Sequence, residues 1–164
     1  LFLRTWSRRR PCDTSEGNSL LPVQAADGAA GRVASSESWH FAELADSVVE
    51  RIATARRRVW ITSPYFVTSH RLRKALRHAS RRGAEVRLLG SGPLTDHPAV
   101  RHAARRFFGK LLRNGVRIFE YQPRVLHAKT VICDDWVSIG SSNLDRWGFK
   151  WNLEANQEIE HGPF

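Results

Sequence analysis

The sequence contains no methionine, only two cysteines and no long apolar run. No stretch approaches the roughly 20 apolar residues of a membrane-spanning helix, and the short apolar start lacks the charge pattern of a signal peptide. Cys12 and Cys133 are not spaced as a metal or redox motif. The absence of methionine, together with an opening LFLRTWSRRR that reads as the end of a helix, predicts that upstream coding sequence is missing.

The 164 residues are 41% hydrophobic and carry a formal net charge of +10. This length and apolar content predict a globular domain with its own core and exclude a disordered chain. A basic surface suits an anionic partner: a nucleic acid, the headgroups of an anionic membrane, or a phosphate substrate. An Arg-rich composition without functional meaning explains the charge equally well, so charge alone assigns no function.

The organisation along the chain predicts one main domain after a linker. Residues 1–10 read as the end of a preceding helix or domain. Residues 11–37 are rich in Gly, Ser, Ala and Pro and predict a linker, with a short strand at 21–26. Residues 38–164 carry the periodic patterns of a folded domain.

Within the main domain, helical and strand-like patterns alternate. Helices are predicted over residues 38–55, 69–82 and 96–114, and strands over 57–64, 84–90 and 116–122, then a hairpin within 125–145 and a last strand ending near 159. Strands that alternate with helices pair in parallel, whereas the last strands have short connections and predict antiparallel pairing. The predicted fold class is therefore α/β, with a mixed β-sheet sandwiched between helices.

The hairpin contains polar residues that a scaffold strand does not need. Alternate side chains of an extended strand share a face, so His127 and Lys129 lie on one face together with Val131 and Cys133. A His beside a Lys makes a poor core, but the pair is useful next to a phosphate. Lys is a fixed positive donor, and His can attack phosphorus or transfer a proton.

Two further groups follow the hairpin. The turn GSSN at residues 140–143 brings the hydroxyl of Ser141 and the amide of Asn143, which could hold phosphate oxygens. Glu154 follows in the segment NLEAN, and a carboxylate near an imidazole fixes its tautomer and stabilises the imidazolium. Each feature alone is common in proteins without catalytic function; their order and tight spacing favour an active site.

The pattern His127-x-Lys129-x4-Asp134, followed by Gly140-Ser141-x-Asn143, resembles the HKD motif of the phospholipase D superfamily. The segments SPYF, RRGAEVRLLGSG and LLRNGVRIFEYQPRVLHAK also resemble the C-terminal half of bacterial cardiolipin synthases. The resemblance implies a phospholipase D-like fold, of which this chain is one of two pseudo-symmetric halves.

The resemblance also implies roles for individual residues over the range 38–160. His127 would be one of two active-site histidines, of which one attacks phosphorus to give a phosphohistidine and the other protonates the leaving alcohol. Lys129 and Asn143, together with Ser141, would bind the phosphate. Glu154 would orient His127.

One member of the motif is assigned differently. Asp134 would lie beside the site and hold the hairpin and the loop in place. No metal or other cofactor is implied, because Lys129, His127 and Asn143 replace the Lewis acid.

The sequence contains one HKD motif, whereas the family uses two around one pocket. None of the six other histidines has a Lys two residues later. The second HKD half therefore either lies upstream in the full chain or is supplied by a homodimer partner.

The function implied is phosphatidyl transfer through a phosphohistidine, in the form of cardiolipin synthesis from phosphatidylglycerol. The alternative enzyme is a metal-independent phosphodiesterase or nuclease acting as an HKD dimer, and a third reading is a noncatalytic half. The implied partners are a phospholipid substrate, an anionic membrane surface and the second HKD half; nucleic acid is the less favoured partner. The implied location is peripheral, on the cytoplasmic side of a bacterial cytoplasmic membrane.

Overall fold

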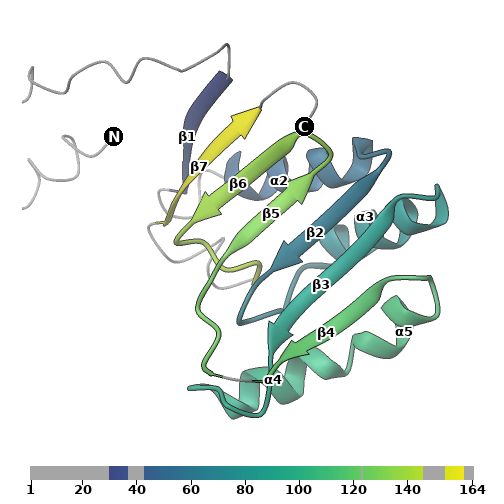
Figure 1. Ribbon diagram of the computed structural model, residues 1–164, viewed down its shortest axis with the longest axis vertical. Helices are drawn as coiled ribbons and strands as arrows, with labels where there is room; N and C mark the ends of the chain where they lie inside the picture. Colours follow the sequence, from purple (N-terminus) through teal and green to yellow (C-terminus); the bar gives the residue numbers. More distant parts are fainter. Residues whose placement is uncertain (1–29, 37–42, 123, 146–153, 161–164) are drawn as a thin grey trace, which may run out of the picture.

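A seven-stranded mixed sheet forms the centre of the molecule (Figure 1). The computed structural model describes residues 30–36, 43–122, 124–145 and 154–160. The strands are β1 (Ala30–Ser36), β2 (Arg58–Thr62), β3 (Glu85–Ser91), β4 (Arg117–Tyr121), β5 (Thr130–Cys133), β6 (Trp136–Gly140) and β7 (Glu154–Glu160). Their order across the sheet is β1-β7-β6-β5-β2-β3-β4.

The pairing follows the predicted division of the sheet. β2, β3 and β4 are parallel neighbours joined by helical connections. A tight turn at residues 134–135 joins β5 to β6. β5 pairs antiparallel with β6 and with β2, and β7 pairs antiparallel with β6 and with β1. The mixed sheet predicted from the sequence is confirmed.

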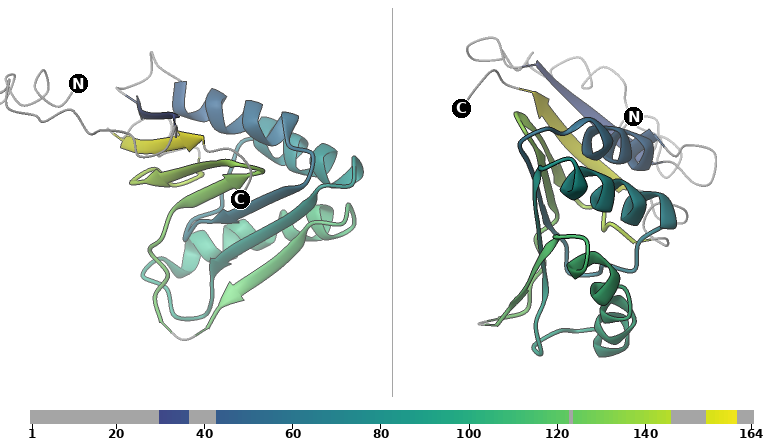
Figure 2. Two further views of the ribbon diagram at one scale, coloured as in Figure 1. Left: turned by 45° about the horizontal axis from the view of Figure 1, so that its top comes forward. Right: turned by 90° about the vertical axis from the view of Figure 1, so that its right-hand side faces the viewer.

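All helices in the described part of the chain cover one face of the sheet (Figure 2). They are α2 (Glu43–Thr54), α3 (His70–Arg81), α4 (Pro98–Arg105) and α5 (Phe108–Leu112). The sequence predicted helices on both faces, and the order of the strands explains the difference. β2, β3 and β4 advance in one direction across the sheet, so successive right-handed crossovers place their helices on the same side.

The core lies between this helical layer and the sheet. In β2, Val59 and Ile61 are buried while their neighbours are half-buried, as expected when alternate side chains face the helices. Helix α3 begins where Ser69 accepts a hydrogen bond from the backbone N–H of Leu72 at 3.2 Å, a capping arrangement that satisfies a free donor. It ends before Gly83, whose φ of 95° is left-handed.

The N-terminal boundary of the domain differs from the prediction. Residues 30–36, placed in the linker, form β1 and pair along their whole length with β7. The folded domain therefore begins before residue 38. The expected helix end at 1–10, the expected strand at 21–26 and the start of the expected helix at 38 lie outside the described residues.

Two predicted elements are shorter than expected. The helix expected over 96–114 is divided into α4 and α5, because the backbone N–H of Phe107 bonds to the carbonyl of Ala104 in a tighter i→i+3 turn. In the hairpin expected within 125–145, β5 begins only at Thr130, because its partner β2 ends at Thr62 and Pro64 has no N–H to extend the ladder.

Candidate active site

The predicted site residues gather at one end of the sheet. β5 runs antiparallel to β2, with Thr130 opposite Thr62, so the chain entering β5 lies beside the chain leaving β2. β6 ends at the same place, because Ile139 is the other neighbour of Thr130. This end, at the lower left of the strands in Figure 1, also receives the start of β7.

His127 and Lys129 precede β5 and differ in exposure. His127 is exposed, whereas Lys129 is only 8% exposed. The Lys129 ammonium donates a hydrogen bond to the backbone carbonyl of His127 at 2.7 Å. Burial lowers the pKa of Lys129, while the negative charges of Glu154 and Asp96 act in the opposite direction. A buried ammonium therefore lies next to an exposed imidazole, and their roles as phosphate donor and reacting group stay predictions.

The turn after β6 is held against β7 by hydrogen bonds. The Asn156 amide oxygen accepts from the backbone N–H of Ser142 at 3.1 Å, and its NH₂ group donates to the Ser138 hydroxyl at 2.9 Å. Ser141 donates its backbone N–H to the carbonyl of Ala155 at 3.1 Å and accepts from the backbone N–H of Ala155 at 3.1 Å through its hydroxyl. The backbone N–H and the hydroxyl of Ser141 are thus already engaged in hydrogen bonds within the protein. The sequence did not single out Asn156 as a site residue.

Asn143 follows in this turn and is half-buried. Its amide oxygen is buried and has no hydrogen-bond partner in the described part of the chain. A buried polar atom without a partner is costly, so it is a feature to be explained by a ligand or by water. Next to it, the backbone N–H of Leu144 bonds to the Ser63 hydroxyl at 3.4 Å, which ties the turn to the residue after β2.

Glu154 is the first residue of β7 and is 7% exposed. Its charge is close enough to Lys129 to oppose the lowering of the Lys129 pKa. The structure therefore brings Glu154, Lys129, His127 and Asn143 to one end of the sheet. The orientation of His127 by Glu154 stays a prediction.

Asp134 does not join this group. It lies in the β5–β6 turn, at the other end of β5, about 20 Å along an extended chain from His127. Its carboxylate accepts the backbone N–H groups of Arg56, Arg57 and Arg58 at 2.8 to 2.9 Å, and its φ of 52° is left-handed. Burial acts to raise the pKa of Asp134, but these three hydrogen bonds lower it overall. The expected position beside the site is corrected, and the contacts fit a role in fixing the hairpin to the start of β2.

Two further polar residues, to which the sequence assigned no catalytic role, lie at the same end of the sheet. The Tyr65 hydroxyl donates to the Asp96 carboxylate at 2.6 Å. This hydrogen bond lowers the pKa of Asp96, and the charges of His97 and His127 add to the effect. Burial, followed by the bond to Asp96, raises the pKa of Tyr65 to about 12. The sequence signal at Asp96 was read only as the start of a helix.

Other candidate features lie elsewhere. A cavity of about 140 Å³ beside α2 is lined by Arg51, Trp136 and Glu158 among others, and by none of the predicted site residues. In the described ranges, no group of three or more His, Cys, Asp or Glu side chains could hold a metal ion. No helix in the same ranges has the length and apolar character needed to cross a membrane.

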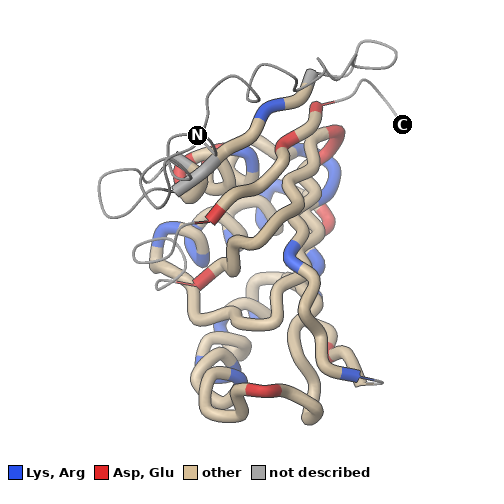
Figure 3. The backbone as a smooth tube through the Cα atoms, turned by 90° about the vertical axis from the view of Figure 1, so that its left-hand side faces the viewer, with Lys and Arg blue, Asp and Glu red and all other residues tan. Residues whose placement is uncertain are grey.

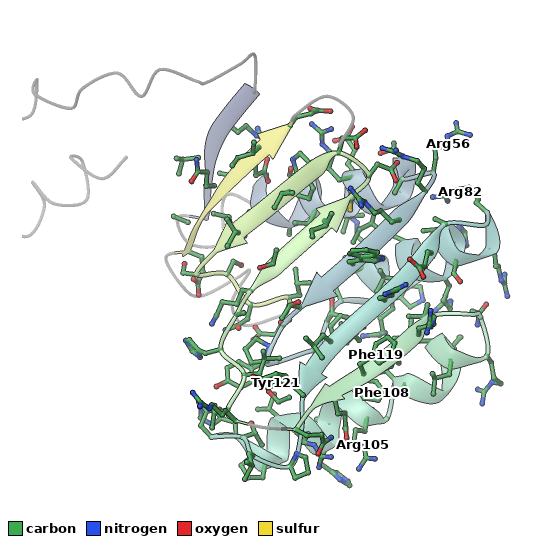
Figure 4. All side chains as sticks on the ribbon, viewed as in Figure 1. Arg56, Arg82, Arg105, Phe108, Phe119 and Tyr121 are labelled. Carbon is green, nitrogen blue, oxygen red and sulfur yellow. The ribbon has the colours of Figure 1, made fainter. Side chains whose placement is uncertain are left out.

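The positive charges are distributed over the molecule. Figure 3 shows Lys and Arg spread along the backbone among Asp and Glu. Arg56 and Arg82 lie near the starts of β2 and β3, whereas Arg105 lies across the molecule on α4 (Figure 4). These arginines do not form one continuous basic surface.

The chain is similar in sequence to bacterial cardiolipin synthases. The chain is 41% identical over 126 residues to cardiolipin synthase B of Escherichia coli strain K12, covering 76% of this chain and 30% of the relative. It is 50% identical over 108 residues to cardiolipin synthase A of Pseudomonas putida strain GB-1, covering 65% of this chain and 22% of the relative. The chain thus spans less than a third of the length of these curated relatives.

Solved structures share the fold. Nuc from Salmonella typhimurium, a phospholipase D family member, superposes with a TM-score of 0.67 at 21% identity, covering 82% of this chain and 85% of Nuc. Phosphatidylserine synthase from Haemophilus influenzae Rd KW20 superposes with a TM-score of 0.65 at 17% identity, covering 80% of this chain and 35% of that chain. The family described as "Cardiolipin synthase, PLD-like domain" matches residues 48–164. The chain belongs to this cardiolipin synthase, phospholipase D-like family.

Proposed function

We propose that this chain carries one half of the active site of a phosphatidyltransferase of the phospholipase D type. The observation that supports the proposal is the position of His127, Lys129, Asn143 and Glu154 at one end of the sheet. An imidazole, an ammonium, an amide and a carboxylate are the groups that phosphodiester transfer through a histidine requires.

In the proposed reaction, a histidine of the second HKD half attacks phosphorus. The P–O bond to the leaving alcohol breaks as a P–N bond forms, and His127 gives its proton to the leaving oxygen. The hydroxyl of the acceptor alcohol then attacks phosphorus, the P–N bond breaks, and His127 takes the hydroxyl proton. The second histidine is restored, and one alcohol has replaced the other on the phosphate.

Lys129, Asn143 and Ser141 would hold the nonbridging phosphate oxygens. Because Lys129 is buried, its charge acts in a poorly solvated place, where a fixed donor stabilises developing negative charge more strongly than it would in water. Asn143 would donate its NH₂ group to a phosphate oxygen, whereas its buried amide oxygen, which has no partner among the described residues, would accept from a donor group of the ligand or from water. Glu154 would stabilise His127 in its protonated form.

The second half of the site must come from outside the described residues. The chain spans 30% of cardiolipin synthase B, which supports a second half elsewhere in a longer protein. With that half, the substrate is a phospholipid, in the form of phosphatidylglycerol, and the product is cardiolipin. The enzyme acts at the cytoplasmic surface of a bacterial membrane as a peripheral protein.

A second candidate is a metal-independent phosphodiesterase or nuclease, in which two copies of the chain form the site. The observation that favours it is the 85% coverage of Nuc, so that the described fold accounts for nearly all of that chain. The identity of 41% to 50% to cardiolipin synthases, against 21% to Nuc, supports the proposal of a lipid substrate over that of a nucleic acid.

The deciding experiment compares two substrates, a phospholipid and a nucleic acid. Wild-type protein is assayed on phosphatidylglycerol vesicles and on double-stranded DNA over a range of protein concentrations, both as this chain and joined to a second HKD half. We expect transfer on vesicles only when the second half is present. Full turnover of vesicles by a proven monomer of this chain would refute the half-site, and cleavage of DNA by a dimer without lipid turnover would favour the nuclease.

The role of His127 is tested with an activated substrate. His127→Asn removes proton delivery to the leaving group, so a nitrophenyl phosphodiester, whose leaving group needs no proton, should still form labelled phosphoenzyme in the two-half protein. Replacing the histidine of the second half should abolish the label. The reverse pattern would show that His127 is the nucleophile.

A further inference from the structure

The pair formed by Tyr65 and Asp96 occupies a defined position relative to His127. Tyr65 is the third residue after β2, and Asp96 lies between β3 and α4. Since β5 pairs with β2 in antiparallel register, the segment containing His127 enters the sheet where Tyr65 leaves it. β3 is the other neighbour of β2, so the loop that carries Asp96 starts at this end as well.

Charge interactions agree with this topology. Asp96 is close enough to His127 and Lys129 for its charge to act on both, since His127 contributes to the lowered pKa of Asp96 and Asp96 opposes the lowering at Lys129. Tyr65 likewise responds to the charge of Asp145 in the turn after β6. The pair therefore belongs to the same end of the sheet as His127 and Lys129.

The chemistry of the pair differs from that of a phosphate site. Asp96 is a carboxylate with a 46% exposed side chain, and one of its oxygens accepts the Tyr65 hydroxyl at 2.6 Å. His97 lies beside them, with its ring 5.2 Å from the Tyr65 ring, and the Thr95 hydroxyl is 3.5 Å from the other Asp96 oxygen. A carboxylate repels a phosphate, but it accepts hydrogen bonds from hydroxyl groups, and each of its oxygens can accept more than one.

We propose that Asp96, held by Tyr65, binds the hydroxyl groups of the alcohol that leaves or attacks beside His127, and that it selects a polyol such as a glycerol headgroup over an alcohol with one hydroxyl. This inference rests on the proposed function. Because His127 protonates the leaving alcohol and then deprotonates the acceptor, both alcohols occupy the same place next to it. The first P–O bond breaks and the second forms there, with the proton passing through His127 in both directions.

The expected selectivity follows from the number of hydroxyl groups. Glycerol has two hydroxyls besides the attacking one and can donate them to the Asp96 carboxylate, whereas 1-propanol has none to donate. A hydrogen bond to a charged group contributes about ten- to a hundred-fold in binding. The structure thus assigns acceptor choice to a residue outside the HKD motif.

The test measures how one intermediate divides between acceptors. A phosphatidyl-nitrophenol donor is given to the protein with both HKD halves, in equal concentrations of glycerol and 1-propanol. Nitrophenol release reports formation of the intermediate, and the ratio of phosphatidylglycerol to phosphatidylpropanol reports acceptor choice within each variant. Asp96→Asn should lower this ratio by about ten- to a hundred-fold, and Tyr65→Phe by about two- to ten-fold. Asp46→Asn, which removes an exposed carboxylate paired with Arg71, is the matched control and should leave the ratio unchanged.

The outcomes separate the two proposals. Nitrophenol release with an unchanged product ratio in Asp96→Asn overturns the alcohol site and leaves the transferase intact. If that variant does not fold, Tyr65→Phe keeps the ring beside His97 and decides the question in the same way. A wild-type protein that releases no nitrophenol overturns both proposals.

Discussion

The amide of Asn156 on β7 joins Ser142 to Ser138, accepting from the first and donating to the second. A strand residue thereby sets the path of the turn that carries the predicted phosphate-binding residue Asn143. Asn156, Ser142 and Ser138 are all buried, so water cannot replace these hydrogen bonds if they are lost. The position of Asn143 depends on this side chain.

Replacing Asn156 should therefore affect both stability and activity. Asn156→Leu leaves the Ser142 N–H and the Ser138 hydroxyl buried without partners, which should cost about 2–4 kcal/mol of unfolding free energy. Turnover of the folded fraction should also fall, because Asn143 loses its support. Urea denaturation and phosphatidyl transfer measure the two effects. Gln157→Leu, an exposed neighbour on the same strand, is the control, and equal effects of the two substitutions would contradict the prediction.

Lys129→Met should lower turnover strongly and leave the melting temperature nearly unchanged. The loss of a preorganised phosphate donor lowers turnover by about 10²–10³. The folded state disfavours the protonated amine, as the lowered pKa shows, so deleting the charge removes a burial cost and the melting temperature should hardly fall. A variant that melts early but keeps its specific activity would make Lys129 a structural residue.

The pH dependence of turnover should reflect the same lowered pKa. If the protonated ammonium binds phosphate, activity falls as pH rises through the pKa of Lys129, and this loss begins at a lower pH than for an exposed lysine. Stability changes in the opposite direction: a lysine with a lowered folded pKa costs less as it deprotonates, so its unfavourable contribution diminishes with rising pH. Lys129→Arg, which stays protonated, should retain activity further into the alkaline range. An unchanged alkaline limb would exclude Lys129 as the titrating group.

Asp134 should matter for stability and not for chemistry. Asp134→Asn keeps the left-handed backbone but loses the charge that three backbone N–H groups share, which should cost about 1–3 kcal/mol. Because the folded pKa is lowered, the stabilisation is present above the unfolded pKa and is lost as pH falls through the folded value. The difference between wild type and variant should therefore shrink in acid. A large loss of turnover in a fully folded Asp134→Asn protein would contradict this prediction and give Asp134 a part in catalysis.

Gly140→Ala should disturb the end of β6. A Cβ at this position would collide with the backbone of Ala155 and Asn156 on β7, so the two strands would have to separate. We expect a loss of about 1–3 kcal/mol, with reduced activity because Ser141 follows directly. Gly31→Ala is the matched control on β1, where the added carbon would meet the Glu158 carbonyl at an ordinary 3.6 Å. Similar melting temperatures for both variants would show that β6 and β7 can move apart.

Elements with strong local patterns were predictable from the sequence. Helix α3 has a capping serine, four buried apolar residues at helical spacing and a terminating glycine, so several local signals agree. The parallel part of the sheet followed from alternation of helices and strands. The residues of the HKD motif were recognisable because their spacing in the chain is short and specific.

Features that depend on distant contacts were not predictable. β1 has Gly, Arg and Ser among its residues and becomes a strand because β7 pairs with it. Asp96 gave a helix-start signal, and only folding brings it next to Tyr65, 31 residues away. Asp134 looked like a neighbour of His127 because both belong to one motif, but an extended strand separates them. Local sequence patterns do not show which residues far apart in the chain come into contact after folding.

The pairing of β1 with β7 has a consequence for synthesis. Among the described strands, Ala30–Ser36 is made first and its partner Glu154–Glu160 last, so at 5–20 residues per second the early strand waits for about 6–25 s on the ribosome. During that time the local unit of β2, α3 and β3 can assemble, while β1 remains an unpaired edge that other chains could join. A nascent chain interrupted before residue 154 therefore lacks the strand that closes the sheet. Arrest at this point should leave aggregation-prone material, which chaperones would have to hold until the last strand emerges.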